Sequence, residues 1–153
     1  QSKQHNLNAA TLKLFFPYGE NDNEKLFVLL VRRFLAGEAM EISKGEQLLN
    51  YTYVSDIVDA FSKTIHYLSL TPNQPYEIFN IGNDESITLR EAVNTLEVLT
   101  GKKNLISLTK EYASDEIMHM ESNNTKAKNI LRWQPKVQLK DGLERMISYY
   151  RSV

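Results

Sequence analysis

The sequence predicts an α/β fold in which strands and helices alternate within one domain. Short apolar runs rich in β-branched and aromatic residues, such as TLKLFF and YEIFNI, have the composition of buried strands. Longer segments between them repeat apolar residues every three or four positions, which is typical of amphipathic helices. Because the two patterns alternate along the chain, we expect helices that pack against a sheet.

Length and composition exclude several classes of protein. The chain has 153 residues and 42% hydrophobic content, enough for one core. Its 18 Lys and Arg residues nearly balance 19 Asp and Glu residues, so there is no basic surface for nucleic acid. It has no cysteine, and no apolar run approaches the roughly 18 residues of a membrane span. We therefore expect a cytoplasmic protein that binds neither nucleic acid nor membrane.

The first expected strand follows a polar lead. Residues 1–10 lack any hydrophobic period, so we expect a lead that is disordered or introduced by cloning, before a folded portion over 11–153. Thr11–Phe16 then reads as a strand whose continuous apolar character suits a sheet covered on both faces. Pro17 and Gly19 are expected to end it.

A helix and a short strand are expected next. Apolar residues cover most of the helical circumference from Leu26 to Leu35, and Gly37 stands where a left-handed cap would end the helix. A short strand over Met40–Ser43 and a turn at Lys44 and Gly45 follow.

The stretch NYTYVSDIVDAF joins a strand to a helix without a spacer. Tyr51–Val54 has strand composition, Ser55 is a candidate N-cap, and Asp56 places negative charge in the first helical turn. The helix carries an apolar stripe that we expect to be buried, formed by Val54, Val58, Phe61, Ile65 and Leu68.

A second strand and helix repeat this order. Tyr76–Ile81 reads as a strand that Gly82 ends. Thr88 and Glu91 have capping-box spacing, and the apolar stripe that follows them stops before Gly101.

The last third of the chain is predicted to hold less regular structure. NLISL is a candidate short strand, and the charged segment 109–124 is a candidate loop. Thr125–Leu131 is expected as a short helix. Leu139–Tyr150 is expected as the final helix, with an inward face formed by Leu143, Met146, Ile147 and Tyr150.

A complete catalytic site is missing from the sequence. None of the 6 glycines forms a glycine-rich phosphate loop, and none of the 8 tyrosines has a lysine four positions later. The 3 histidines, His5, His66 and His119, have no partner at helical spacing. We therefore assign no catalytic residue and no metal ligand.

Four segments together resemble a known family. TLKLFFPYGEND, GEQLLNYTYVSDIVDAF, YEIFNIGNDESITLREAVNTL and NNTKAKNILRWQPKVQLKDGLERMISYY occur in the order and spacing of the C-terminal half of the extended short-chain dehydrogenase/reductases. The chain is similar there to NAD(P)-dependent nucleotide-sugar epimerases and dehydratases. The resemblance implies the last two strands of a Rossmann-type sheet, Thr11–Phe16 and Tyr76–Ile81, and a small α/β substrate-binding lobe.

The resemblance also implies partners and a reaction. In the family, the N-terminal half carries the glycine-rich loop and the catalytic tyrosine and lysine, so that half is the expected partner. NAD or NADP is expected to bind the parent protein, a homodimer, and not this chain alone. The implied reaction is a transient hydride transfer between a sugar carbon and nicotinamide, followed by epimerisation, dehydration or reduction.

The resemblance assigns substrate-binding residues. The loop after the first strand would lie near the nicotinamide and the sugar, and a second group would line the nucleotide pocket. The expected ligand is a CDP-, UDP- or dTDP-sugar. The residues are Phe15, Phe16, Pro17 and Tyr18 in the loop, with Gln47 and Tyr51 in the pocket.

Two alternatives remain open. The family usually has an arginine where Leu49 stands, and a planar guanidinium holds a diphosphate through two oxygens at once. A chain without it fits a non-catalytic binding module of the same fold that has lost the diphosphate grip. An oligomerisation or scaffold piece is the other alternative, and it would expose a large apolar surface.

Overall fold

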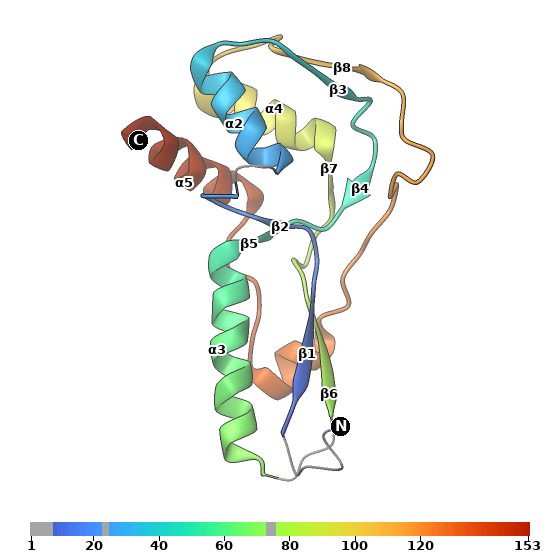
Figure 1. Cartoon of the computed structure of the whole chain (residues 1–153), viewed down its shortest axis with the longest axis vertical. Helices are drawn as coiled ribbons and strands as arrows, with labels where there is room; N and C mark the ends of the chain where they lie inside the picture. The colour runs from blue at the N-terminus through green and yellow to red at the C-terminus, as the bar shows by residue number, and fades with distance from the viewer. Residues whose placement is uncertain (1–7, 23–24, 73–75) are drawn as a thin grey trace.

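The structure is a computed structural model that describes residues 8–22, 25–72 and 76–153 (Figure 1). One group of elements, at the bottom of Figure 1, is built around a parallel pair of strands and the long helix α3. The other group, at the top, contains three helices and a two-stranded arm. This arrangement confirms the predicted alternation of strands and helices.

The first group contains the two strands expected to belong to one sheet. β1 (Ala10–Leu14) pairs in parallel with β6 (Glu77–Ile81), and α3 (Val54–Leu70) packs against β1. A π-helical turn, η1 (Ala127–Leu131), contacts both α3 and β6. Trp133 is fully buried between these elements. The small core of this group is formed by Ile57, Ala60, Phe79, Ile81, Ala127, Leu131 and Trp133.

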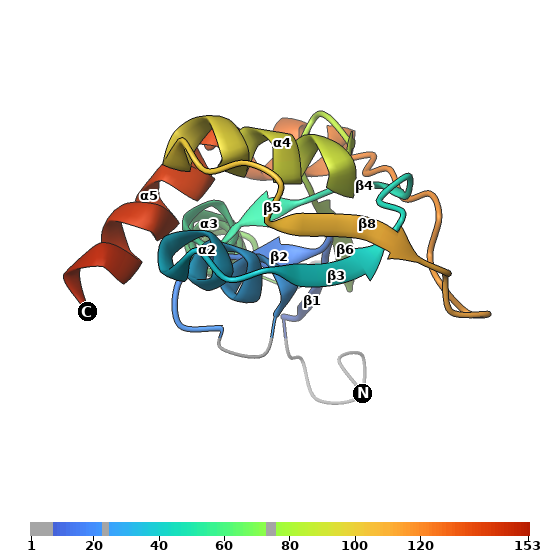
Figure 2. The same ribbon diagram turned by 90° about the horizontal axis from the view of Figure 1, so that it is seen from above.

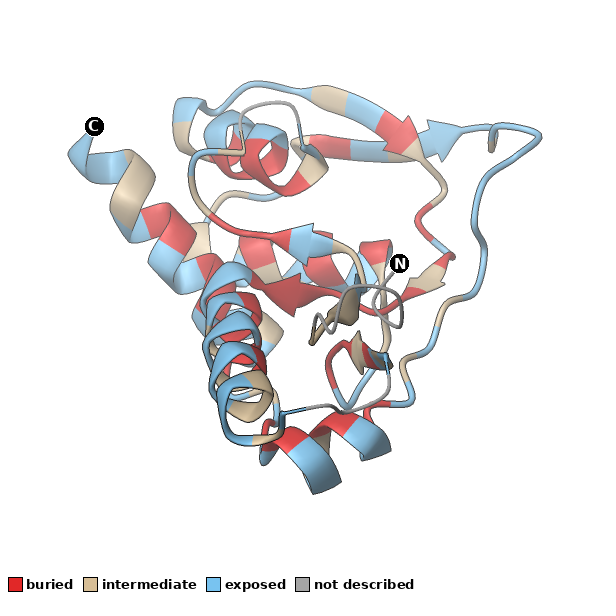
Figure 3. Cartoon of the chain, turned by 60° about the horizontal axis from the view of Figure 1, so that its bottom comes forward, coloured by how far each residue is buried: buried red, intermediate tan, exposed pale blue. Residues whose placement is uncertain are grey.

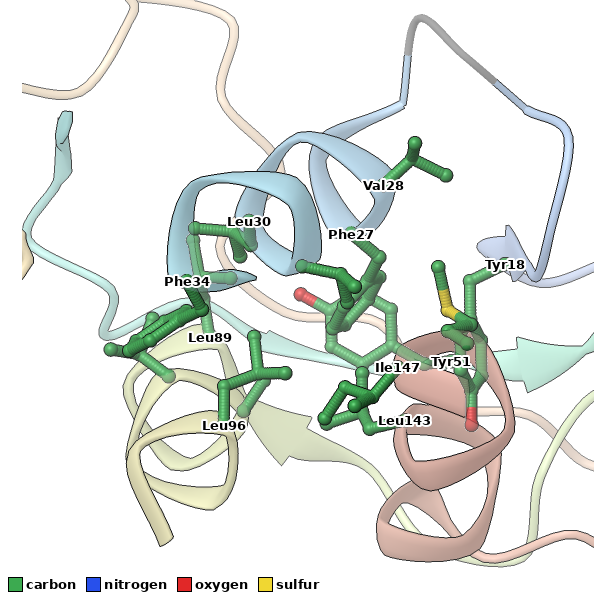
Figure 4. Packing of buried hydrophobic residues seen from close by; sticks show 14 of the residues in the cluster. Tyr18, Phe27, Val28, Leu30, Phe34, Tyr51, Leu89, Leu96, Leu143 and Ile147 are labelled. Atoms are coloured by element: carbon green, nitrogen blue, oxygen red, sulfur yellow. The ribbon is translucent and has the colours of Figure 1, made fainter. Parts of the chain in front are cut away.

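The second group contains the main core. α2 (Leu26–Ala36), α4 (Leu89–Thr100) and α5 (Leu139–Ser152) pack against one another. Their buried side chains interleave in Figure 4. β3 (Met40–Ser43) and β8 (Ile106–Lys110) lie side by side in parallel and form the arm that Figure 2 shows from above.

Two short strand pairs connect the groups. β2 (Pro17–Tyr18) pairs in parallel with β5 (Thr52–Tyr53). β4 (Leu48–Leu49) pairs in antiparallel with β7 (Ile87–Thr88). Each strand has only 2 residues, too few to show a pattern in the sequence.

Several helix ends confirm the local signals in the sequence. Gly37 and Gly101 follow α2 and α4 with φ of 75° and 71°, in the left-handed region that glycine tolerates. Thr88 and Glu91 form the capping box at the start of α4.

The predicted N-cap of α3 is wrong. The helix begins at Val54, so Ser55 lies inside it, and Tyr53 is the capping residue without a side-chain bond. Asp56 occupies the first turn as predicted, but its carboxylate accepts the backbone N–H groups of Lys136 and Val137, each at 3.0 Å. A distant segment, and not the local cap, therefore holds this helix start.

The expected burial of the α3 stripe is also wrong for this chain. Val54, Val58, Phe61 and Ile65 are 39%, 61%, 49% and 68% exposed. The buried residues of α3 lie on a different side of the helix, as the colours of Figure 3 show: Asp56, Ile57, Ala60 and Thr64. Leu68, the fifth residue of the stripe, is half-buried, so the described residues leave most of the stripe open to solvent.

The first strand is shorter and less covered than expected. β1 ends at Leu14, which is 40% exposed, and among the described residues β1 pairs only with β6. Pro17 opens β2 instead of ending the extended chain. The break between the two strands is at Phe16, whose φ of 26° bends the backbone.

The later elements follow the prediction with shifted ends. The strand expected at NLISL runs over Ile106–Lys110. The short helix has the predicted bounds, because residues 125–126 are α-helical and lead into the π-helical η1, whose C-cap Arg132 has a φ of 54°. In α5, Tyr150 is half-buried, whereas the other predicted inward residues are buried. No helix within residues 8–22, 25–72 and 76–153 combines the length and apolarity needed to cross a membrane.

Candidate functional site

A cavity of about 230 Å³ lies where the junction between β1 and β2, the start of α2 and the segment from Gln47 to Tyr51 meet. Four of the six predicted substrate-binding residues line it: Phe16, Pro17, Gln47 and Tyr51. The other lining residues are Lys25, Leu26, Phe27, Leu49, Leu89 and Glu116. The structure thus brings together residues that the sequence analysis took from two separate segments. Their binding role stays a prediction.

The bend at Phe16 turns its side chain to the cavity. The backbone is held on both sides of the bend, because Phe15 N–H donates to the Ile81 carbonyl at 3.1 Å and Thr52 N–H donates to the Phe16 carbonyl at 3.2 Å. The Phe16 ring packs edge-on against Tyr51, with 5.8 Å between centroids. A positive φ is unfavourable for phenylalanine, so these contacts hold the cavity wall in a strained conformation.

Gln47 is the most buried polar residue of the cavity lining, at 3% exposed. Its Nε2 donates to Ser43 Oγ at 3.1 Å and to Glu116 Oε1 at 3.2 Å. Its Oε1 is buried and has no hydrogen-bond partner among the described residues. The side chain therefore offers an unused acceptor.

Tyr51 forms an aromatic wall. Its ring packs edge-on against Phe27, with 4.7 Å between centroids, as well as against Phe16. Burial, and secondly the negative charge of Glu116, raise the pKa of the Tyr51 hydroxyl. The hydroxyl therefore stays protonated at neutral pH, as a neutral group able to donate a hydrogen bond.

The start of α2 forms another side of the cavity. Lys25, Leu26 and Phe27 line it, and the first turn of α2 contains no acidic residue. The first N–H groups of a helix have no intrahelical acceptor, so this side is electropositive. Leu49 adds an apolar surface and is 5% exposed.

Two predicted residues lie outside the cavity lining. Tyr18 is 3% exposed and packs in the core against Phe27 and Tyr53, with centroid distances of 5.0 and 5.3 Å. Figure 4 shows its ring beside α5. Burial raises the pKa of its hydroxyl, which has no partner among the described residues. Phe15 is half-buried and does not line the cavity.

Sequence reasoning missed Lys25, Leu26, Phe27, Leu89 and Glu116. The apolar residues were recognised only as helix positions, because the same pattern describes core and cavity walls. Glu116 lies after β8, in the irregular segment 111–124, and no periodicity there indicates which acid reaches the cavity. In the part of the chain that the structure describes, no group of three or more His, Asp or Glu side chains converges to hold a metal ion.

Sequence comparison relates this chain to enzymes that act on nucleotide sugars. The model of the NAD dependent epimerase/dehydratase family matches residues 1–82. UDP-glucuronic acid decarboxylase 5 of Arabidopsis thaliana is 29% identical over 153 residues, which cover 97% of this chain and 43% of that protein. The dTDP-4-dehydro-6-deoxyglucose reductase of Escherichia coli is 28% identical, with 98% of this chain and 47% of that protein covered.

Structural comparison agrees. UDP-glucose 4-epimerase of Thermotoga maritima, solved with UDP-glucose, matches 99% of this chain and 48% of its own, with a TM-score of 0.86 and 27% identity. MoeE5, solved with UDP-glucuronic acid and NAD, matches with a TM-score of 0.85 and 25% identity, over 95% of this chain and 48% of its own. The chain is thus a Rossmann-like α/β segment that spans about half the length of the proteins it matches.

Proposed function

Because the chain belongs to the NAD dependent epimerase/dehydratase family, we propose that residues 11–153 form the C-terminal, substrate-binding portion of an NAD(P)-dependent nucleotide-sugar epimerase, dehydratase or reductase. The observation that carries this proposal is the cavity in which Phe16, Pro17, Gln47 and Tyr51 meet. The similar proteins decarboxylate, reduce or epimerise UDP- or dTDP-linked sugars, according to their names.

The cavity suits one part of such a ligand. Its volume of about 230 Å³ is below the roughly 300–1,000 Å³ of cavities that bury a whole drug-sized ligand. Aromatic walls at Phe16 and Tyr51 provide apolar contact, and the polar side chains of Gln47 and Lys25 can orient a bound ligand. The electropositive start of α2 favours the diphosphate on that side.

We further propose that an N-terminal cofactor-binding half covers the exposed stripe of α3 and extends the sheet beyond β1. Val58, Phe61 and Ile65 form an apolar surface that water disfavours, and Leu14 and Ile78 on the strand pair are each 40% exposed. β1 pairs with one strand among the described residues, so its other edge is available for a further strand.

The residues of this chain do not fit NAD on their own. A dinucleotide site needs a glycine-rich turn between strand and helix, which the sequence lacks. At the spacer-free junction of β5 and α3, the first turn carries the carboxylate of Asp56, which would repel a pyrophosphate. We therefore assign to this chain the holding and orienting of the substrate, and no step of the reaction.

Calorimetric titration of this chain tests the proposal. We expect saturable binding of UDP-glucose, UDP-glucuronate or a dTDP- or CDP-sugar. Lys25→Ala should weaken that binding at least threefold, and the matched variant Lys13→Ala, at an exposed position of β1 outside the cavity lining, should not. NAD should not bind in the micromolar range, and a micromolar dissociation constant for NAD would contradict the proposed division between the two halves.

One observation favours the non-catalytic binding module. Leu49 lines the cavity and brings no positive charge to it. Mixing this chain with an N-terminal half of the family and NAD distinguishes the two functions. Turnover of a nucleotide sugar by the mixture supports the enzyme. Binding of the nucleotide sugar by the mixture without turnover supports the binding module.

A further inference from the structure

The chain that leads from β2 into α2 is held by the C-terminal end of α5. The backbone N–H of Asn21 donates to the hydroxyl of Tyr150 at 3.0 Å, and the hydroxyl of Tyr149 donates to Oδ1 of Asn21 at 2.8 Å. We call these two bonds the Asn21 anchor. The φ of Asn21 is 65°, in the left-handed region that asparagine adopts more readily than most residues. Two adjacent tyrosines thus hold both the backbone and the side chain of a residue at a turn.

The two tyrosines are themselves fixed by their rings. The guanidinium of Arg32, on α2, lies 5.0 Å from the centroid of the Tyr150 ring, a distance that suits a cation–π contact. The rings of Tyr149 and Tyr150 pack edge-on with 5.0 Å between centroids, and both side chains are half-buried. Tyr150 therefore bridges α2 and the segment that precedes it.

The start of α2 has no side-chain cap of its own. Lys25 is the N-cap residue, and its side chain makes no capping bond. The backbone N–H of Lys25 donates instead to the carbonyl of Asp22 at 3.0 Å, and Asp22 follows Asn21 directly. Because helix ends without caps fray, the placement of Lys25 depends on the Asn21 anchor beside this bond.

Lys25 is the residue through which the Asn21 anchor reaches the cavity. It lines the cavity, whereas Asn21 and the two tyrosines do not. A side chain that is ordered before a ligand arrives loses less conformational entropy on binding. An anchor that restricts Lys25 therefore strengthens the binding of an anionic group without touching the ligand.

We infer that Tyr149 and Tyr150 are positioning residues, which hold Lys25 in place for the anionic part of the ligand. The inference rests on the proposed function, which assigns ligand binding to the cavity. It gives the last helix of the chain a role in binding, although no residue of α5 lines the cavity.

Removing the two hydroxyls tests this inference. Tyr149→Phe combined with Tyr150→Phe keeps both rings and deletes both bonds of the Asn21 anchor. Calorimetric titration with the nucleotide sugar that binds the wild-type chain should give a dissociation constant about three- to tenfold higher. Amide hydrogen exchange at Lys25 should become faster, because the turn that holds its N–H is loosened. The Tm should fall by less than about 4 °C.

Two further variants separate positioning from general stability. Tyr76→Phe is the matched control, because the Tyr76 hydroxyl is also hydrogen-bonded to a distant segment, at Thr11, but Tyr76 lies outside the cavity lining. It should change neither the dissociation constant nor the exchange at Lys25. In a Lys25→Ala background, the two tyrosine changes together should raise the dissociation constant by less than about twofold, since residues that act through one another are not additive.

The outcomes distinguish this inference from the proposed function. If the tyrosine variant binds the nucleotide sugar like the wild type, only the inference is overturned. The same holds if the loss of affinity persists in full in the Lys25→Ala background, or if exchange at Lys25 is unchanged. If the wild-type chain binds no UDP-, dTDP- or CDP-sugar, the proposed function fails and the inference fails with it.

Discussion

The indole N–H of Trp133 donates a hydrogen bond of 2.9 Å to the backbone oxygen of Asp56, although the two residues belong to distant parts of the chain. Trp133 is fully buried, and the Asp56 carboxylate accepts two backbone N–H groups from the segment that follows it. The first turn of α3 and the segment before α5 are therefore held together by three hydrogen bonds, one to the backbone oxygen of Asp56 and two to its carboxylate.

Removing the Asp56 carboxylate should destabilise the whole chain. Asp56→Ala removes the acceptor of the buried Val137 N–H and of the part-buried Lys136 N–H, so we expect a loss of about 2–4 kcal/mol in the free energy of unfolding. Urea unfolding at neutral pH measures it. Asp115→Asn, at an exposed position, should change this free energy by less than about 0.5 kcal/mol. If Asp56→Ala and Asp115→Asn lowered the free energy of unfolding by similar amounts, the bonds accepted by the Asp56 carboxylate would not be a particular source of stability.

Tyr18 and Gly142 should respond to substitution as a pair. A Cβ at position 142 would meet the Tyr18 hydroxyl and would lie 2.9 and 3.0 Å from two of its ring carbons. We expect Gly142→Ala to cost about 1–3 kcal/mol from overpacking, despite the better helix propensity of alanine. Thermal unfolding of the purified variants measures the cost.

A second substitution isolates the cause. The Tyr18 hydroxyl is buried and unpartnered among the described residues, so Tyr18→Phe alone should be neutral or stabilising. In the double variant it should recover part of the loss caused by Gly142→Ala. Strict additivity of the two changes would contradict the predicted contact.

The capping box of α4 should make stability depend on pH. The backbone N–H and the hydroxyl of Thr88 donate to the carboxylate of Glu91 and hold its pKa below the ordinary value of 4.5. A depressed pKa in the folded state means that this carboxylate stabilises the fold above about pH 4.5. The contribution is lost as the pH falls through the lower pKa of the folded state.

The measurement is urea unfolding of the wild type and Glu91→Gln at pH 7, 5 and 3. The difference in free energy of unfolding between the wild type and Glu91→Gln should shrink at the lowest pH. Thr88→Ala should lower the free energy of unfolding by about 1 kcal/mol at pH 7. Glu144→Gln, on the exposed side of α5, should show no such convergence. If the Glu91 difference stays constant from pH 7 to pH 3, the carboxylate form is not what stabilises the cap.

The exposed stripe of α3 should tolerate polar residues. Val58→Gln combined with Ile65→Gln should change the free energy of unfolding by no more than about 0.5 kcal/mol per site, because both side chains are largely exposed. The same variant should bind less of a hydrophobic dye and associate at least tenfold more weakly with an added N-terminal half. Ile57→Ala, on the buried face of the same helix, should cost about 2–5 kcal/mol. A comparable cost for the stripe variant would mean that this chain itself covers the stripe.

Local signals in the sequence were sufficient to predict most of the helices and longer strands. The hydrophobic period and the left-handed glycines located α2 and α4, since both depend only on neighbouring residues. The capping box at Thr88 was confirmed for the same reason. The pair formed by β1 and β6 appeared as two apolar runs, although their shortened ends were not predicted.

Features that depend on distant partners were beyond the sequence. The stripe on α3 showed that one helix face is apolar, but an apolar pattern does not show whether anything lies against it. Ser55 had the residue type of a cap, yet the helix, held by the bonds of Asp56 to a distant segment, begins two residues earlier than that cap would place it. Glu116 reaches the cavity from an irregular loop, where position in space is set by neighbours and not by period.

The register of β1 and β6 has a consequence for how the chain folds. It pairs Ala10 with Glu77 and Leu14 with Ile81. The chain between the two strands contains α2, β3 and all of α3, so a loop of that length must close when the strands pair. Closing so long a loop costs chain entropy before the pairing returns any stabilisation, which slows proteins rich in distant contacts. Refolding should therefore begin with the helices around the main core, and the docking of β1 should set the rate at which the last native signal appears.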